Sequence, residues 1–265
     1  MKKPVFTNKH TYIIQAFVLV AVSYGLLIVY PGKFFLVFVL SLILVISTNM
    51  FMYSTDIDLL NLLIVSIPSA CLFFGVYLTL QFFPNLSLSF KILGLLISAG
   101  AYYILALVNN IFLVVKKRGE VIPLYRVAQT WSNIMIVTVS IPLLSGIFKL
   151  PISTFFQGAL AGVVTSLFIV YSLWAVSFDP DARKFKVGES ATLVFLGFFI
   201  VFALDLAVSF IPTESFLRAL YISSVLMFAL TVVLGHVRNK ISRGLLLENS
   251  LIVLLFLFLL FFFRG

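Results

Sequence analysis

Charged residues and cysteines are scarce in this chain. Asp, Glu, Lys and Arg make up only 10% of its 265 residues, whereas hydrophobic residues make up 62%. A soluble domain is near half apolar and about a quarter charged, so these values exclude an ordinary soluble fold. Cys71 is the single cysteine of the chain, which excludes an intrachain disulfide and any cysteine-based metal cluster. The sequence predicts no resident cofactor.

Long apolar runs are what the chain has instead. A helix that crosses a bilayer needs about 20 mainly apolar residues. We therefore predict an all-α, polytopic transmembrane helical bundle of about nine spans, which forms a single transmembrane domain over residues 1–265. The last span has a short purely apolar core, so the bundle has eight spans if that segment is interfacial. The expected spans lie near residues 12–30, 34–52, 59–83, 90–115, 127–148, 152–178, 190–211, 215–235 and 245–263.

The basic residues are distributed unevenly between the loops. The net charge of +9 would suggest nucleic acid in a soluble protein, but basic residues also collect in cytoplasmic loops of membrane proteins. With the N-terminus inside, cytoplasmic segments hold 13 of the 18 Lys and Arg residues. We therefore expect a multi-pass protein of the cytoplasmic (inner) membrane, with its N-terminus in and its C-terminus out. Its expected partners are anionic headgroups at the cytoplasmic face, and no nucleic acid.

Asp205 is the acidic residue that lies well inside a predicted span. A charge at that depth is costly and usually faces the bundle interior or a cavity. Arg218 lies at a similar depth on the next helix, so we expect the two side chains to form an ion pair. Glu214 precedes Arg218 by one helical turn and could also reach it. The pair has two open interpretations, a structural link between helices, which we favour, and a proton or ion relay.

An uncharged polar cluster is expected near the cytoplasmic side. Asn109 and Asn110 end the fourth span, and Gln129 and Asn133 begin the fifth. Amides bind well between helices in lipid, with about 1 kcal/mol or less from each bond. We favour interhelical hydrogen bonding over the alternative, a polar vestibule for a solute.

Small residues mark one span, and prolines mark two others. Gly158 and Gly162 form a GxxxG pattern on the sixth span, which predicts close helix approach, with a partner in the same chain favoured over a second copy. Pro68 in the third span and Pro142 in the fifth could mark broken helices, although neighbouring groups can also satisfy such kinks.

Two pairs of carboxylates and one run of bases lie on the predicted cytoplasmic side. Paired carboxylates can hold a Mg²⁺ ion that bridges a diphosphate, but Asp also favours turns and helix starts. The run of bases could meet a phosphate or a lipid headgroup. The acids are Asp56, Asp58, Asp179 and Asp181, and the bases are Lys116, Lys117 and Arg118.

These residues carry a resemblance to one enzyme family. The stretch 179–197, DPDARKFKVGESATLVFLG, resembles the second aspartate-rich motif of intramembrane aromatic prenyltransferases, which have nine spans and an N-terminus inside. The resemblance implies that Asp179 and Asp181 would bind Mg²⁺ and a prenyl diphosphate, with bases at 116–118. The family's first motif begins Asn-Asp, whereas Asn49 is followed here by Met50.

A second resemblance concerns the end of the fourth span and the start of the fifth. The stretches NIFLV at 110–114 and IPLYRVA at 122–128 resemble an uncharacterised family of multi-spanning bacterial membrane proteins. This resemblance implies no activity.

Three classes of function are therefore expected, in descending order. The first is a non-catalytic membrane component or scaffold, whose partners are other membrane proteins or further copies of the chain. The second is a small-molecule or ion transporter. The third is a Mg²⁺-dependent, prenyltransferase-like enzyme with degenerate aspartate-rich motifs. The balance leans against an enzyme, because an activity needs site-level evidence beyond fold analogy.

Overall fold

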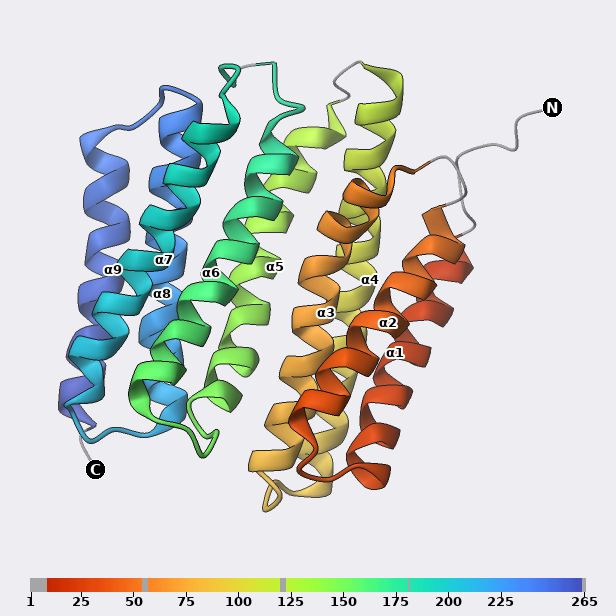
Figure 1. The fold of residues 1–265 in the computed structure, drawn as a ribbon, viewed down its shortest axis with the longest axis vertical. Coiled ribbons are helices and arrows are strands. Elements are labelled where there is room, and N and C mark those ends of the chain that lie inside the picture. The colour runs from red at the N-terminus through yellow and green to blue at the C-terminus, as the bar shows by residue number, and fades with distance from the viewer. Residues whose placement is uncertain (1–8, 54–56, 120–122, 181, 264–265) are drawn as a thin grey trace. The chain divides into compact units, whose positions relative to one another are not determined.

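The computed structural model describes residues 9–53, 57–119, 123–180 and 182–263. These residues form helices and turns and contain no strand, in agreement with the predicted all-α class. The helices are α1 (Lys9–Val29), α2 (Phe34–Tyr53), α3 (Leu59–Phe82), α4 (Leu88–Arg118), α5 (Leu124–Ile147), α6 (Thr154–Val176), α7 (Val187–Ser209), α8 (Ser215–Val237) and α9 (Arg243–Phe262) (Figure 1).

All nine helices of the described residues are long and apolar enough to cross a membrane. The prediction of a polytopic bundle is therefore confirmed at the level of length and composition, and the ninth segment forms a helix of 20 residues. The polar residues at the start of this segment belong to α9, where the Asn249 side chain has hydrogen-bond partners on α9 and α8. The Asn249 side chain donates to the carbonyl of Leu245 at 2.8 Å and faces the Thr231 hydroxyl on α8 at 3.4 Å.

Several helix ends differ from the predicted spans, and the residues at each end give the reason. α4 continues to Arg118, because three bases suit the negative end of the helix dipole and Gly119 ends the helix in the left-handed region, at φ 68°. α7 begins at Val187, three residues earlier than predicted, with Glu189 in its first turn. It ends at Ser209, shortly before Pro212, which cannot continue a helix.

The two internal prolines do not break their helices. Pro68 lies inside α3 and Pro142 inside α5, and both helices continue through them. Pro68 has no N–H for the carbonyl four residues before it. The amide of Asn109 on α4 donates to the adjacent carbonyl, that of Val65, at 3.2 Å. A side chain of the neighbouring helix α4 thus binds backbone close to Pro68, as is usual in membrane helices.

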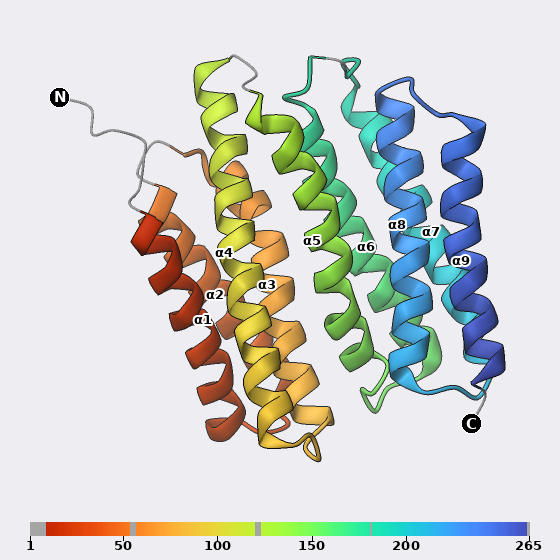
Figure 2. The ribbon, with the colours of Figure 1, turned by 180° about the vertical axis from the view of Figure 1, so that it is seen from behind.

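The chain forms two compact units, and the boundary falls inside α5. Unit 1 covers Met1–Met135 and unit 2 covers Ile136–Gly265. In unit 1, α1 and α3 each contact the other three of the helices α1–α4, and α3 is the most deeply buried of the four. Figure 2 shows α4 lying along α3 and α1. Side chains of α3 such as Phe73 and Tyr77 are completely buried in this unit.

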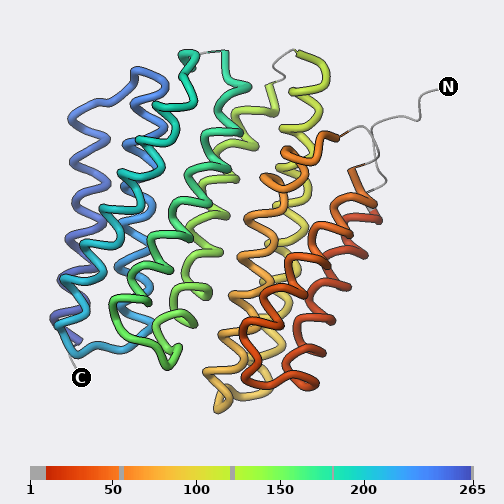
Figure 3. Tube along the Cα trace, viewed as in Figure 1, coloured from red at the N-terminus to blue at the C-terminus, as the bar shows by residue number. Residues whose placement is uncertain are grey.

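Unit 2 is organised around α6, α7 and α8, which contact one another pairwise. The trace in Figure 3 shows α7, α8 and α9 as consecutive antiparallel helices, with α9 packed against α8. The helices of both units also expose large apolar side chains, such as Phe35 on α2, Phe199 on α7 and Phe258 on α9. Apolar patches of this extent would drive association in water, whereas lipid chains solvate them.

Candidate functional site

The most deeply buried charges form an ionic centre in unit 2, composed of Asp205, Arg218 and Gln157. Asp205 is completely buried and Arg218 is 8% exposed. Arg218 Nε donates to Asp205 Oδ1 at 2.8 Å, and Arg218 Nη2 donates to Asp205 Oδ2 at 2.6 Å. Arg218 Nη1 donates to Gln157 Oε1 at 3.0 Å. This two-pronged geometry is the strong form of an arginine–carboxylate contact.

The surroundings of the ionic centre satisfy its remaining polar groups. The Gln157 side-chain nitrogen donates to the carbonyls of Phe148 and Leu150, at 3.3 and 3.1 Å, in the turn between α5 and α6. The Arg218 guanidinium lies over the Phe148 ring, 4.2 Å from its centroid. Cation–π attraction of this kind strengthens when the cation is desolvated. The centre therefore links α6, α7, α8 and the α5–α6 turn.

The ionic centre lies about one helical turn from one end of unit 2. Gln157 and Arg218 are the fourth residues of α6 and α8, and Asp205 lies four residues before the end of α7. At a rise of about 1.5 Å per residue, each lies roughly 4.5–6 Å from its helix end. Glu214, the residue before α8, is exposed and meets Arg218 through the backbone, where its carbonyl accepts the Arg218 N–H. In the described chain its carboxylate is not a partner of Arg218.

Glycines allow the close approach of α6 and α7 on which the ionic centre depends. A Cβ at Gly158 would lie 3.1 Å from Asp205 Oδ2, and one at Gly162 would lie 2.7 Å from the Phe198 ring. On α7, Gly197 accommodates the Ile169 side chain of α6 in the same way. The GxxxG pattern of α6 therefore packs against α7 of the same chain.

Unit 1 contains a second buried polar group, which the sequence analysis did not identify. We call it the amide chain, and it consists of Gln15, Asn49 and Ser66. Gln15 donates to Asn49 at 3.0 Å, Asn49 donates to Ser66 at 2.9 Å, and Ser66 donates to the Leu62 carbonyl at 2.8 Å. The chain links α1, α2 and α3. Asp205 and Arg218 were paired because they lie at a similar depth on consecutive helices. The same comparison of depth could have paired Asn49 with Ser66.

Two members of the predicted amide cluster are buried, and the other two are half-buried. Asn109 is buried on α4 and binds α3 through the Val65 carbonyl, and Gln129 on α5 is also buried. Asn110 and Asn133 are half-buried. The bond to Val65 is interhelical, as expected for amides that join helices in lipid.

Of the predicted metal-binding acids, Asp56 and Asp181 lie outside the described residues. Asp58 precedes α3 and does not cap it with its side chain, because Asp58 Oδ2 accepts from Asn61 at 2.9 Å and from Lys116 at 3.4 Å. Asp179 follows α6, and its Oδ2 accepts from Arg238 Nη2 at 2.7 Å and Nε at 3.0 Å.

These two contacts occupy equivalent places in the two units. Asp58 follows α2 and meets Lys116, in the last turn of α4. Asp179 follows α6 and meets Arg238, directly after α8. In each case the acid follows one helix and the base ends the second helix after it. Lys117 and Arg118, the other bases of the predicted run, are exposed in the last turn of α4.

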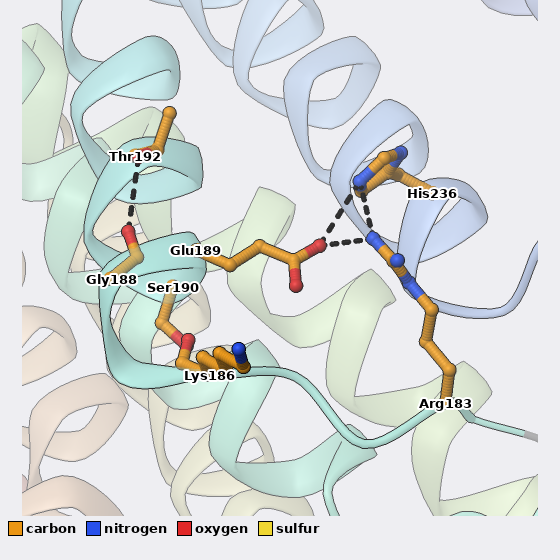
Figure 4. A network of polar contacts seen from close by, with 7 residues as sticks. All are labelled: Arg183, Lys186, Gly188, Glu189, Ser190, Thr192 and His236. Carbon is orange, nitrogen blue, oxygen red and sulfur yellow. Dashed lines mark hydrogen bonds and ion pairs between the residues drawn. The ribbon is translucent and has the colours of Figure 1, made fainter.

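A further charged cluster joins the α6–α7 loop to the ends of α7 and α8 (Figure 4). Arg183 Nη2 contacts Glu189 Oε1 and lies 2.7 Å from His236 Nε2, which is 3.2 Å from the same Glu189 oxygen. His236 Nε2 can accept from Arg183 only without a proton, and can donate to Glu189 only with one. The imidazole therefore binds one of these partners at a time.

Over the described residues, no group of three or more His, Cys, Asp and Glu side chains is arranged to hold a metal ion. Asp58 and Asp179 each have a basic partner instead. A Mg²⁺ ion at either carboxylate would have to displace a lysine or an arginine.

Comparisons of the chain matched no protein-family model, no curated protein and no solved structure. Function has to be inferred from the residues themselves, and both family resemblances remain predictions from the sequence.

Proposed function

We propose that the protein is a non-catalytic integral membrane component, a helical scaffold whose unit 2 is held together by the ionic centre. The observation that carries this proposal is the saturation of that centre. Asp205 accepts two hydrogen bonds from Arg218, and the third guanidinium nitrogen binds Gln157. A carboxylate that one guanidinium holds through both oxygens is fixed in place, which suits a structural link between helices.

A transporter, the second expected class, would use the same residues differently. A relay needs a carboxylate that exchanges protons with water and changes partner during the cycle. The test is Asp205→Asn in proteoliposomes, with internal pH followed by a fluorescent dye and protein stability measured in parallel. A scaffold predicts no proton flux in the parent protein and a less stable variant. Flux that Asp205→Asn abolishes without loss of stability would overturn the proposal.

Glu214→Gln provides the matched control for this test. Glu214 lies next to α8, close to Arg218 in sequence, but its side chain is exposed and does not bind the guanidinium. Removing its charge should leave stability within about 0.5 kcal/mol of the parent protein, as for most surface substitutions. The comparison separates loss of the ionic centre from loss of a negative charge on this side of the membrane.

One observation favours a second function, Mg²⁺-dependent transfer from a prenyl diphosphate. Asp58 and Asp179 recur at equivalent places of the two units, each next to a base. A magnesium diphosphate would replace this contact, with the carboxylate on Mg²⁺ and the displaced base on the phosphate oxygens. The test is the thermal stabilisation of the protein by geranyl diphosphate with and without Mg²⁺. A Mg²⁺-dependent shift that either Asp58→Asn or Asp179→Asn removes would support this function, and no shift in the parent protein would exclude it.

We also infer the orientation, N-terminus in the cytoplasm and C-terminus outside the inner membrane, from the distribution of basic residues. Single substitutions Lys33→Cys and Lys117→Cys, in a Cys71→Ser background, allow labelling with a membrane-impermeant maleimide in intact cells. This orientation predicts labelling at position 33 and none at position 117 until the cells are opened. The reverse pattern would contradict it.

A further inference from the structure

The two loops at the end of unit 2 where α6 and α8 finish are tied together. The N–H of Arg183, in the α6–α7 loop, donates to the carbonyl of Val237, the last residue of α8, at 3.1 Å. Arg238 then holds Asp179 of the first loop. The two loops therefore present one continuous surface.

The α8–α9 loop has a defined conformation at this point. Asn239 ends α8 in the left-handed region, at φ 52°, where asparagine is among the favoured residues. Its N–H donates to the His236 carbonyl at 3.1 Å, and the Lys240 N–H donates to the Gly235 carbonyl at 2.9 Å. This pair of bonds is a Schellman motif, which satisfies the last carbonyls of α8. Ile241 then folds back over Gly235, where a Cβ would lie 3.1 Å from its side chain.

The described acids of these loops are already paired with bases. Asp179 binds Arg238, and Glu189 contacts Arg183 and His236. Three exposed cations are left over, and among the described residues none of them has an acidic partner: Lys184, Lys186 and Arg243.

Apolar side chains alternate with these cations. Val187 follows Lys186 and is 88% exposed, and Ile241 precedes Arg243 and is 45% exposed. Exposed apolar groups between bases suit the boundary between acyl chains and headgroups, where lysine and arginine extend their charges toward phosphates. The ends of membrane-spanning helices lie at this depth.

We propose that this cationic loop surface, formed by Lys184, Lys186, Val187, Ile241 and Arg243, binds the phosphate headgroup of an anionic phospholipid. The charge complementarity comes from three cations that no described acid of the two loops pairs with. The apolar side chains select a lipid over a soluble phosphate, because they gain from burial only when acyl chains accompany the headgroup. This inference is independent of the scaffold proposal, since no residue of the ionic centre takes part.

The experiment measures lipid binding to the purified full-length protein in neutral detergent, by native mass spectrometry. Phosphatidylglycerol is compared with phosphatidylcholine, for the parent protein and for the triple variant K184Q/K186Q/R243Q. Each base near an anionic surface contributes about a fivefold preference, so the triple variant should bind phosphatidylglycerol roughly a hundredfold more weakly. Affinity for phosphatidylcholine should stay within about twofold. Unchanged phosphatidylglycerol affinity in the triple variant would overturn the proposal.

Two controls test whether the site is local and whether it requires a lipid. The variant K116Q/K117Q/R118Q removes the same charge from the end of α4 and should lower phosphatidylglycerol affinity by less than threefold. An equal loss in both variants would indicate diffuse electrostatic attraction and overturn the local site. Inorganic phosphate, tested alone as a competitor at millimolar concentration, should not displace the lipid, and full displacement would show a general anion site instead. Circular dichroism verifies that each variant keeps its helical content.

Discussion

Replacing Asp205 by asparagine should destabilise unit 2 strongly, although the change in shape is small. Asparagine has one side-chain oxygen in place of two, and its NH₂ group would face the Arg218 guanidinium. The substitution leaves a buried guanidinium without its counter-charge. Breaking a buried ion pair from one side costs about 3–5 kcal/mol. The ionic centre lies about 6 Å from a helix end, so the long arginine side chain can turn partly toward water. We therefore expect a loss near the lower limit, about 3 kcal/mol.

A double-mutant cycle separates the pair from its surroundings. Arg218→Met leaves Asp205 buried without a partner and should also cost about 3 kcal/mol, whereas D205N/R218M removes both charges. The double variant should therefore lose only about 2 kcal/mol, well below the sum of the two single losses. The assay is reversible unfolding in mixed micelles with rising sodium dodecyl sulphate, followed by circular dichroism. A loss below about 0.5 kcal/mol for Asp205→Asn, or an additive cycle, would refute a structural ion pair.

Three further predictions concern packing and hydrogen bonds elsewhere in the chain, all measured by the same unfolding assay. Gly158→Ala should cost about 1–3 kcal/mol, because its Cβ would lie 3.1 Å from Asp205 Oδ2, whereas the control Gly94→Ala has nothing within 4 Å and should be neutral or slightly stabilising. Asn49→Leu should cost about 1–2 kcal/mol by removing two interhelical hydrogen bonds of the amide chain, and a neutral result would show that these bonds contribute nothing net. Arg238→Gln removes an ion pair whose side chains are 26% and 10% exposed and should cost about 1 kcal/mol, so a loss like that of Asp205→Asn would mean that this pair is coupled as tightly as the ionic centre.

Some contacts could be predicted because they depend on depth alone. Asp205 and Arg218 lie on consecutive antiparallel helices joined by a short turn, so counting residues from the turn places them at the same level. The same counting could not add Gln157. That residue lies on α6 and reaches Arg218 on α8, and the sequence does not state that these two helices are neighbours.

Other features of the sites depend on packing between helices and were missed for that reason. Depth on consecutive helices could bring the residues of the amide chain to one level, but whether they face one another depends on how the three helices are rotated. The pairing of Glu189 with Arg183 and His236 needs the α6–α7 loop to fold against the end of α8. Neither the rotation of a helix nor the path of a loop is a local property of the sequence.

The sequence by itself determined the class of protein, the number of apolar helices and their approximate limits, because hydropathy is a local property that acts over about 20 residues. Only the tertiary structure decided which face of each helix is buried. In water, burial can be predicted from the alternation of apolar and polar faces along a helix. In lipid both the interior and the exterior of a bundle are apolar, so this signal is weak, and the rotation of each helix is set by glycine contacts and hydrogen bonds with its neighbours. Gly158 and Gly162 against α7, and Arg218 between Asp205 and Gln157, are the contacts that set it in unit 2.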